Sequence, residues 1–318
     1  MLLLIALVLL VLPPVDLRFG ESGKFQFEFG GFHVLGVLSL VVLLALELAD
    51  RVIMKRDLEI AREIQQWLVP AAPPQIPGVD IAFATRPANT VAGDYYDAFL
   101  RPSTGGTPSG AAAAGAENSG LPSLAPVSRL LLVVADVAGK SVPAALLMAT
   151  FQASLRTLAA RPSSLVELVD GLNLYVTAHS RGGLRFTTAF LAELDPVSGA
   201  LTSVNAGHNA PVLRRAAGGL ERLDTGGLPL GIKSDGRYES ATTTVRPGDV
   251  LVIFTDGVVE AENLKGDEYG EPRLLDLLSG TPVVSAQQAL GMLMASVDSF
   301  VGPARQHDDV TCLLMRMV

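Results

Sequence analysis

The chain has 318 residues, which is enough for one large domain with additional segments. Its formal net charge is -8, with 24 Lys and Arg residues against 32 Asp and Glu residues. This balance excludes the basic surface of a nucleic-acid-binding protein, so we expect no nucleic-acid partner. The single cysteine, Cys312, excludes an intramolecular disulfide and a cysteine-based metal site.

The N-terminal part of the chain is strongly apolar. Residues Met1 to Leu12 are all apolar, and residues 32–46 are nearly all apolar. A membrane-spanning helix needs about 20 such residues, so we predict a membrane region over 1–48 with one or two transmembrane helices. Arg51 and Lys55 follow the second apolar segment. The positive-inside rule then predicts a protein of the cell membrane whose remaining residues lie in the cytoplasm.

A helix is predicted after the membrane region, because residues 47–69 contain no Gly or Pro and are rich in helix formers. We assign 49–69 as a linker helix with a regulatory role. Its apolar residues form two stripes. Either the helix packs only against its own domain, or one stripe is left for a homodimer contact. The candidate regulatory residues are Ile53, Ile60, Ile64 and Trp67.

Short strands and paired helices are predicted over the remaining domain, 70–318. The expected strands are 79–85, 130–135, 185–194, 200–206, 211–214, 241–246, 249–255 and 310–317. The expected helices are 143–160, 163–178, 272–279 and 284–300. Residues 101–127 are rich in Gly, Ser, Pro and Ala without periodicity, which is typical of a low-complexity insertion. Helix pairs with mostly antiparallel strands predict an α+β layered sandwich.

Acidic residues occur in four short motifs that lie far apart in the sequence. The motifs are Gly93–Asp97, Ala135–Gly139, Thr255–Gly257 and Asp308–Thr311. Several of them border predicted strands, and carboxylates from strand ends can form one oxygen-rich pocket. Such a pocket suits Mg²⁺ or Mn²⁺. Two ions of this kind, a few Å apart, can activate a water molecule and bind a phosphoryl group.

From about Glu59 to Val318, the chain resembles the bacterial PPM-type (PP2C-like) serine/threonine phosphatases of the SpoIIE and RsbU kind. The resemblance rests on motifs in the same order, which include Ala61–Gln65, Ala92–Asp97, Asp136–Lys140, Ala206–Pro211, Gly227–Gly231, Phe254–Ala261 and Asp308–Thr311. It implies the PPM αββα sandwich, with two antiparallel sheets flanked by helix pairs. It also implies two Mn²⁺ or Mg²⁺ ions and hydrolysis of phosphoserine or phosphothreonine on a protein.

The same resemblance assigns residues to the metal site. The implied ligands are carboxylates of both halves of the domain and one backbone carbonyl: Asp94, Asp136, Val137, Asp256, and Asp308 or Asp309. The sequence does not choose between the last two. Asp94, Asp136 and Asp256 are the expected catalytic residues, and Lys140 is a candidate for binding substrate phosphate, although a solvated lysine fits equally well. Ser141 stands where a glycine is common in the family.

The resemblance implies a phosphorylated protein substrate, commonly a STAS-type anti-anti-sigma factor. Two other functions remain open. The chain could be a catalytically inactive, membrane-anchored signalling scaffold that uses the linker helix. It could also be a P-loop NTPase, because Gly139, Lys140 and Ser141 follow a predicted strand and precede a helix. A P-loop would need glycine at the position of Val134, which disfavours the NTPase.

Overall fold

The computed structural model describes residues 30–103, 127–180, 185–280 and 283–318. The chain divides into two units, Met1–Ile60 and Ala61–Val318. One helix, α2 (Gly30–Leu68), begins in the first unit and ends in the second. It contains most of the predicted linker helix and also the second predicted membrane segment.

The predicted transmembrane helix at 32–46 is not supported. Among the residues that the structure describes, no helix is long and apolar enough to cross a membrane. Charged residues from Glu47 onward interrupt the described apolar part of α2. The other predicted segment, Met1 to Leu12, lies outside the described residues, and the membrane location stays a prediction.

Helix α2 has two faces that differ in exposure. One of its two apolar stripes contains Leu58, Ala61, Ile64 and Leu68, and it is half-buried at all of these residues except Ile64. The four candidate regulatory residues are all exposed: Ile53, Ile60, Ile64 and Trp67. Ile64 is therefore exposed like the other three, although its spacing places it in the same stripe as Leu58, Ala61 and Leu68. The exposure of these four apolar residues leaves them available for a partner.

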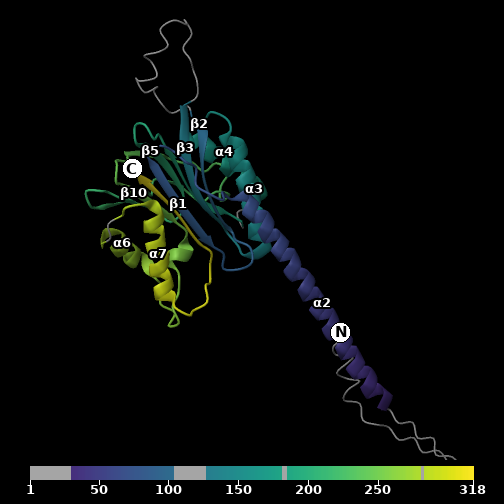
Figure 1. Ribbon diagram of the computed structural model, residues 1–318. Helices are drawn as coiled ribbons and strands as arrows, with labels where there is room; N and C mark the ends of the chain where they lie inside the picture. Colours follow the sequence, from purple (N-terminus) through teal and green to yellow (C-terminus); the bar gives the residue numbers. More distant parts are fainter. Residues whose placement is uncertain (1–29, 104–126, 181–184, 281–282) are drawn as a thin grey trace, which may run out of the picture. The chain divides into compact units, whose positions relative to one another are not determined.

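Two β-sheets form the centre of the second unit (Figure 1). The first sheet has the order β1 (Val79–Arg86), β11 (Val310–Met317), β10 (Val250–Phe254), β6 (Val212–Arg214) and β7 (Leu220–Arg222). The second has the order β2 (Asp94–Ser103), β3 (Val127–Val137), β4 (Thr187–Leu194), β5 (Ala200–Ala206) and β8 (Gly226–Gly227), while β9 (Ala241–Thr244) also pairs with β5. All of these strand pairs are antiparallel except β5 with β8.

Helices cover the outer face of each sheet (Figure 1). Helices α3 (Ser141–Ala159) and α4 (Leu165–His179) pack on the second sheet, and α6 (Gly270–Gly280) and α7 (Ala286–Val301) pack on the first. The short helix α5 (Asp256–Val259) follows β10. A capping box starts α4, since Ser164 accepts the Glu167 amide and the Glu167 carboxylate accepts the Ser164 amide. The αββα arrangement confirms the predicted fold class.

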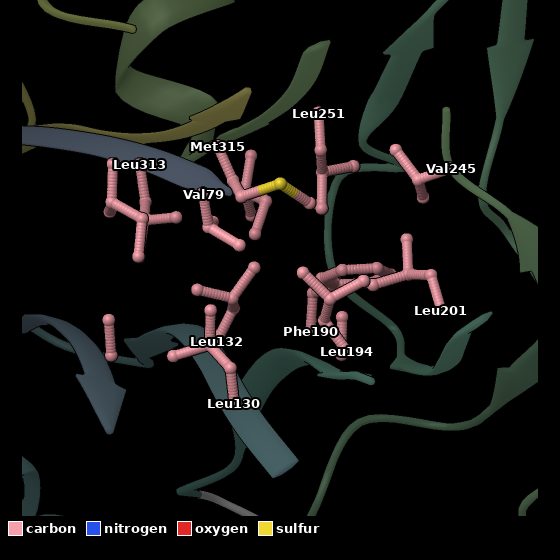
Figure 2. Packing of buried hydrophobic residues seen from close by; sticks show 14 of the residues in the cluster. Val79, Leu130, Leu132, Phe190, Leu194, Leu201, Val245, Leu251, Leu313 and Met315 are labelled. Atoms are coloured by element: carbon pink, nitrogen blue, oxygen red, sulfur yellow. The ribbon is translucent and has the colours of Figure 1, made fainter. Parts of the chain in front are cut away.

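Apolar side chains fill three layers, one between the sheets and one under each helix pair. Figure 2 shows the central layer, where Leu313 and Met315 of the first sheet lie opposite Leu130 and Leu132 of the second. Because both faces of each sheet are covered, strands such as β10 are continuous apolar runs. Burial of one such leucine stabilises the fold by about 1.5–3 kcal/mol.

The predicted bounds of the insertion, 101–127, extend into the strands on both sides. Strand β2 continues to Ser103 and β3 begins at Val127, so only 104–126 remains between the strands, and it lies outside the described residues. Arg101 has a fully buried side chain whose guanidinium lies 3.5 Å from the carboxylate of Glu193 on β4. This buried ion pair allows a charged residue to continue the strand, which a composition-based boundary overlooks.

Candidate active site

Strand pairing brings the two acidic residues of the first half together. Asp94 is the first residue of β2 and Asp136 is near the end of β3, and the two are directly opposite each other in the antiparallel pair. Residues in such positions have Cβ atoms about 4.5–5.5 Å apart. Val137 ends β3 immediately after Asp136. The hairpin therefore places both predicted carboxylates and the Val137 carbonyl at one end of the second sheet.

The acidic residues of the second half lie at one end of the first sheet. Asp256 follows β10, Asp308 precedes β11, and these two strands are antiparallel neighbours. Thr255 connects the two halves, because its hydroxyl donates a 2.9 Å hydrogen bond to Asp94 Oδ2. The same hydroxyl accepts the amide of Thr311 at 3.0 Å. The carboxylates of the first and second halves thus meet where the ends of the two sheets adjoin.

Two glycines make this close approach possible. A Cβ atom at Gly257 would lie 1.9 Å from the backbone oxygen of Asp309, which no side chain can tolerate. A Cβ atom at Gly93 would lie 3.2 Å from the Val137 oxygen and 3.7 Å from Asp136 Oδ1. Gly257 therefore allows the backbone before β11 to approach closely, and Gly93 keeps space free beside Val137 and Asp136.

Burial and mutual repulsion raise the pKa values of the clustered carboxylates. For Asp136, burial and then the nearby Asp256, Asp308 and Asp309 raise the pKa to about 7. Burial and then Asp136 raise the pKa of Asp94 well above its usual range. Burial and then Asp308 raise the pKa of Asp256. Burial and repulsion therefore disfavour the charged forms of these carboxylates, and a divalent cation would stabilise those charged forms.

The raised pKa of Asp136 predicts how the stability of the metal-free protein depends on pH. Between an ordinary value of 3.8 and about 7, the folded chain holds a proton that the unfolded chain has lost. The free energy of unfolding therefore falls as pH rises through this interval. In EDTA, we expect a lower melting temperature at about pH 7.5 than at about pH 5.5 by differential scanning fluorimetry, with a weaker decline in Asp136→Asn. A midpoint that rises with pH would contradict this prediction.

Asp308 and Asp309 have different surroundings. The carboxylate of Asp309 accepts the amides of Ala88 and Gly93, each at 2.7 Å. Its two oxygens therefore hold the loop that leads into Asp94. The carboxylate of Asp308 is instead half-exposed and lies 2.9 Å from Lys140 Nζ.

Lys140 lies at the edge of the carboxylate cluster. Its Nζ also donates to the backbone oxygen of His307 at 3.0 Å, and its side chain is 59% exposed. The position is compatible with contact to a substrate phosphate, which stays a prediction. An ammonium bound to Asp308 is a different arrangement from a lysine held over a phosphate-binding backbone loop, which further disfavours the P-loop alternative.

The donor set fits a hard divalent cation. Among the described side chains, no group of three or more His, Cys, Asp or Glu residues is already arranged to hold a metal ion. The predicted ligands are nevertheless all oxygen donors, and Asp94, Asp136 and Asp256 are close enough to raise one another's pKa values or those of their neighbours. Oxygen donors with excess negative charge are what Mg²⁺ and Mn²⁺ prefer.

Ser141 has a strained backbone at the start of α3, with φ = 63°. A left-handed conformation costs a residue with a Cβ atom about 1–2 kcal/mol, whereas glycine adopts it freely. We expect Ser141→Gly to raise the free energy of unfolding by up to about 1 kcal/mol in urea denaturation, after the greater flexibility of unfolded glycine is subtracted. Ser154→Gly, inside the same helix, is the control and should lower it by a similar amount. A Ser141→Gly protein that is less stable than the wild type would contradict this prediction.

Two contacts of the site were not predicted from the sequence. The Gln65 side chain donates to the Ala92 oxygen at 2.8 Å and accepts the Ala92 amide at 3.0 Å. The end of α2 is thereby fixed to the residue before Gly93. The other contact is the Thr255–Asp94 hydrogen bond. Both Gln65 and Thr255 lie inside motifs that carry the resemblance to the phosphatase family. Membership of these motifs was the signal by which the sequence could have indicated a role for the two residues in the site.

A family model described as Stage II sporulation protein E (SpoIIE) matches residues 126–318, more than half of the chain. Protein IcfG of Synechocystis sp. is 24% identical over 297 residues, which cover 85% of this chain and 43% of IcfG. The phosphoserine phosphatase RsbU of Bacillus subtilis is 26% identical over 264 residues, which cover 83% of this chain and 70% of RsbU. The chain thus spans less than half the length of IcfG.

A solved structure shares the fold. The SiaA-PP2C domain of Pseudomonas aeruginosa has a TM-score of 0.67 at 18% sequence identity, covering 85% of this chain and 99% of that domain. Together, the sandwich and the acidic site between its sheets define a PP2C-type phosphatase fold. The chain belongs to the SpoIIE family, which confirms the resemblance found in its motifs.

Proposed function

We propose that this protein is a metal-dependent phosphatase that removes phosphate from phosphoserine or phosphothreonine on a regulatory protein. The observation that carries the proposal is the meeting of buried Asp94 with half-buried Asp136 and Asp256, from both sheets, in one cluster with raised pKa values. The family membership supports the same reaction class. A STAS-type protein is the proposed substrate, and this part rests on the resemblance alone.

Within the proposed reaction, the residues of the cluster would bind the metal ions or orient a metal ligand. Two Mn²⁺ or Mg²⁺ ions, when bound, would supply positive charge for the phosphoryl group and an activated water. Asp94 and Asp136 would hold them from the second sheet, with the Val137 carbonyl, and Asp256 from the first. Thr255 orients Asp94 through its hydrogen bond.

We propose Asp308 as the further ligand, in preference to Asp309. Both Asp309 oxygens already accept backbone amides, so this side chain positions the Gly93–Asp94 loop. Lys140 would have to exchange its contact with Asp308 for one with the substrate phosphate. These roles follow from what each side chain already contacts.

Phosphate release from a protein substrate tests the proposal directly. The 318-residue chain is incubated with a phosphorylated STAS-type protein and, separately, with p-nitrophenyl phosphate, each with and without Mn²⁺. Hydrolysis of both substrates supports the whole proposal. Hydrolysis of p-nitrophenyl phosphate alone retains the phosphatase but rejects the STAS-type substrate. Hydrolysis of neither substrate favours the signalling scaffold.

We also propose that α2 regulates the enzyme through a homodimer. Its exposed apolar residues support this, together with the two hydrogen bonds that join Gln65 to Ala92, next to Gly93 and Asp94. Replacing Ile53 and Ile60 by Glu should weaken self-association in sedimentation and change turnover, while the melting temperature moves little. Gln66→Glu, which adds charge at another exposed position of α2, is the control. Unchanged self-association and turnover in the double variant would contradict the regulatory role and indicate that α2 serves only as a spacer.

A further inference from the structure

A cavity of about 400 Å³ adjoins the carboxylate cluster. Its walls come from the end of β1, the segment around α5, the C-terminal end of α7 and the segment before β11. It shares Lys140, Gly257 and Asp308 with the site described above. The volume lies in the range of about 300–1,000 Å³ that is usual for ligand pockets. A peptide whose phosphorylated residue reaches the carboxylates would have neighbouring residues within reach of this cavity.

The charges that line the cavity do not balance. Its two cationic side chains are already paired: Arg86 makes two hydrogen bonds to Asp298, and Lys140 contacts Asp308. Three further carboxylates line the cavity: Glu260, Glu262 and Glu268. Among the described residues, Glu262 has only His307 as a cationic neighbour, at 3.9 Å, and no ion pair is found for Glu260 or Glu268.

The cavity also has an apolar wall, formed by Val297, Val301, Ala304 and Val310. A pocket lined by both carboxylates and aliphatic side chains matches a side chain with an aliphatic stem and a cationic head. Lysine and arginine bury their stems on apolar surface while the head binds carboxylate oxygens. A bare metal ion would gain nothing from the valine wall.

We propose that this cavity binds a Lys or Arg side chain close to the phosphorylated residue of the substrate. The inference rests on the proposed phosphatase function and adds a sequence preference to it. A basic residue near the phosphoserine would place its cationic group between the carboxylates of Glu262 and Glu268. Among the described residues, neither carboxylate forms an ion pair with a Lys or Arg side chain. The pocket thereby selects among phosphorylated segments that the carboxylate cluster alone would treat alike.

Matched phosphopeptides test the preference with the 318-residue chain and Mn²⁺. The peptides share one phosphoserine and differ only in one residue, Arg or Gln, placed in turn at each position near the phosphoserine. At one or more positions, we expect kcat/KM to be about tenfold higher with Arg, mainly through KM, as expected for one to two exposed or half-buried ion pairs. The double variant Glu262→Gln/Glu268→Gln should remove most of this Arg-to-Gln ratio. Glu239→Gln, an exposed glutamate outside the cavity, is the control and should retain it.

The outcomes separate this inference from the proposed function. Equal kcat/KM for Arg and Gln peptides at every position, or the same ratio in the double variant as in the wild type, would overturn the basic-residue pocket. Such a result, together with Mn²⁺-dependent turnover of p-nitrophenyl phosphate, leaves the phosphatase itself intact. No turnover of any substrate by the wild-type chain would reject the proposed function first. Melting temperatures of all variants verify that they are folded.

Discussion

Replacing Asp136 by Asn should lower turnover by about a thousandfold or more while the protein remains folded. Asp136 faces Asp94 across the strand pair and is also repelled by Asp256 and Asp308, so it lies at the centre of the cluster. The substitution removes one proposed ligand of the cations. In EDTA the variant should be as stable as the wild type or more stable by up to a few kcal/mol at neutral pH, because like-charge repulsion is relieved.

Steady-state kinetics and thermal melting in EDTA measure the two effects separately. Asp235→Asn, an exposed carboxylate outside the site, is the matched control and should change neither quantity. Loss of activity with a large loss of stability would mean that Asp136 serves the fold rather than the chemistry. Turnover close to wild type in both Asp136→Asn and Asp256→Asn would favour the scaffold alternative.

Removing divalent cations should abolish turnover of the wild-type chain, and adding Mn²⁺ should restore it. The physical reason is that the carboxylate cluster lacks enough internal cations to neutralise both itself and a phosphoryl group. Binding should also be visible without any substrate. A cation at about 100 times its Kd raises the free energy of unfolding by about 2.7 kcal/mol, so Mn²⁺ should raise the melting temperature of the wild type more than that of Asp136→Asn.

Chelation followed by dialysis against metal-free buffer gives the starting material for both measurements. Ca²⁺, which prefers more ligands at longer distances, is a useful comparison ion. Full turnover after exhaustive chelation would rule out the metal-dependent mechanism. A melting temperature that does not respond to Mn²⁺ in either protein would place the cations elsewhere.

The sequence predicted most of the sandwich because its strands are buried on both faces. Strands β10 and β11 are nearly uninterrupted apolar runs of strand length, and such runs are typical of strands that are covered on both sides. Strand β2 was not among the predicted strands, and it contains the charged residues Asp94, Asp97 and Arg101. Asp97 is in fact fully buried, bound by two hydrogen bonds from Arg156. Local composition does not contain that partner, which is 59 residues away.

The sequence likewise predicted which acidic residues belong to the site, but not the role of each residue. Asp308 and Asp309 are chemically identical neighbours, so only their surroundings distinguish them. Those surroundings depend on Ala88 and Gly93, more than 200 residues earlier in the chain. The membrane prediction depended on apolar length alone, and the described part of α2 does not provide that length.

The position of the carboxylates between two sheets has a consequence for partial unfolding. Asp94 belongs to one sheet and Asp256 follows a strand of the other, and the Thr255 hydroxyl joins them. We expect a fluctuation that separates the sheets to part these groups while the hydrogen bonds within each sheet persist. Mild denaturant should therefore inactivate the protein at concentrations where circular dichroism still reports intact secondary structure. In such a protein, loss of activity would report a change in the alignment of the two sheets before their secondary structure is lost.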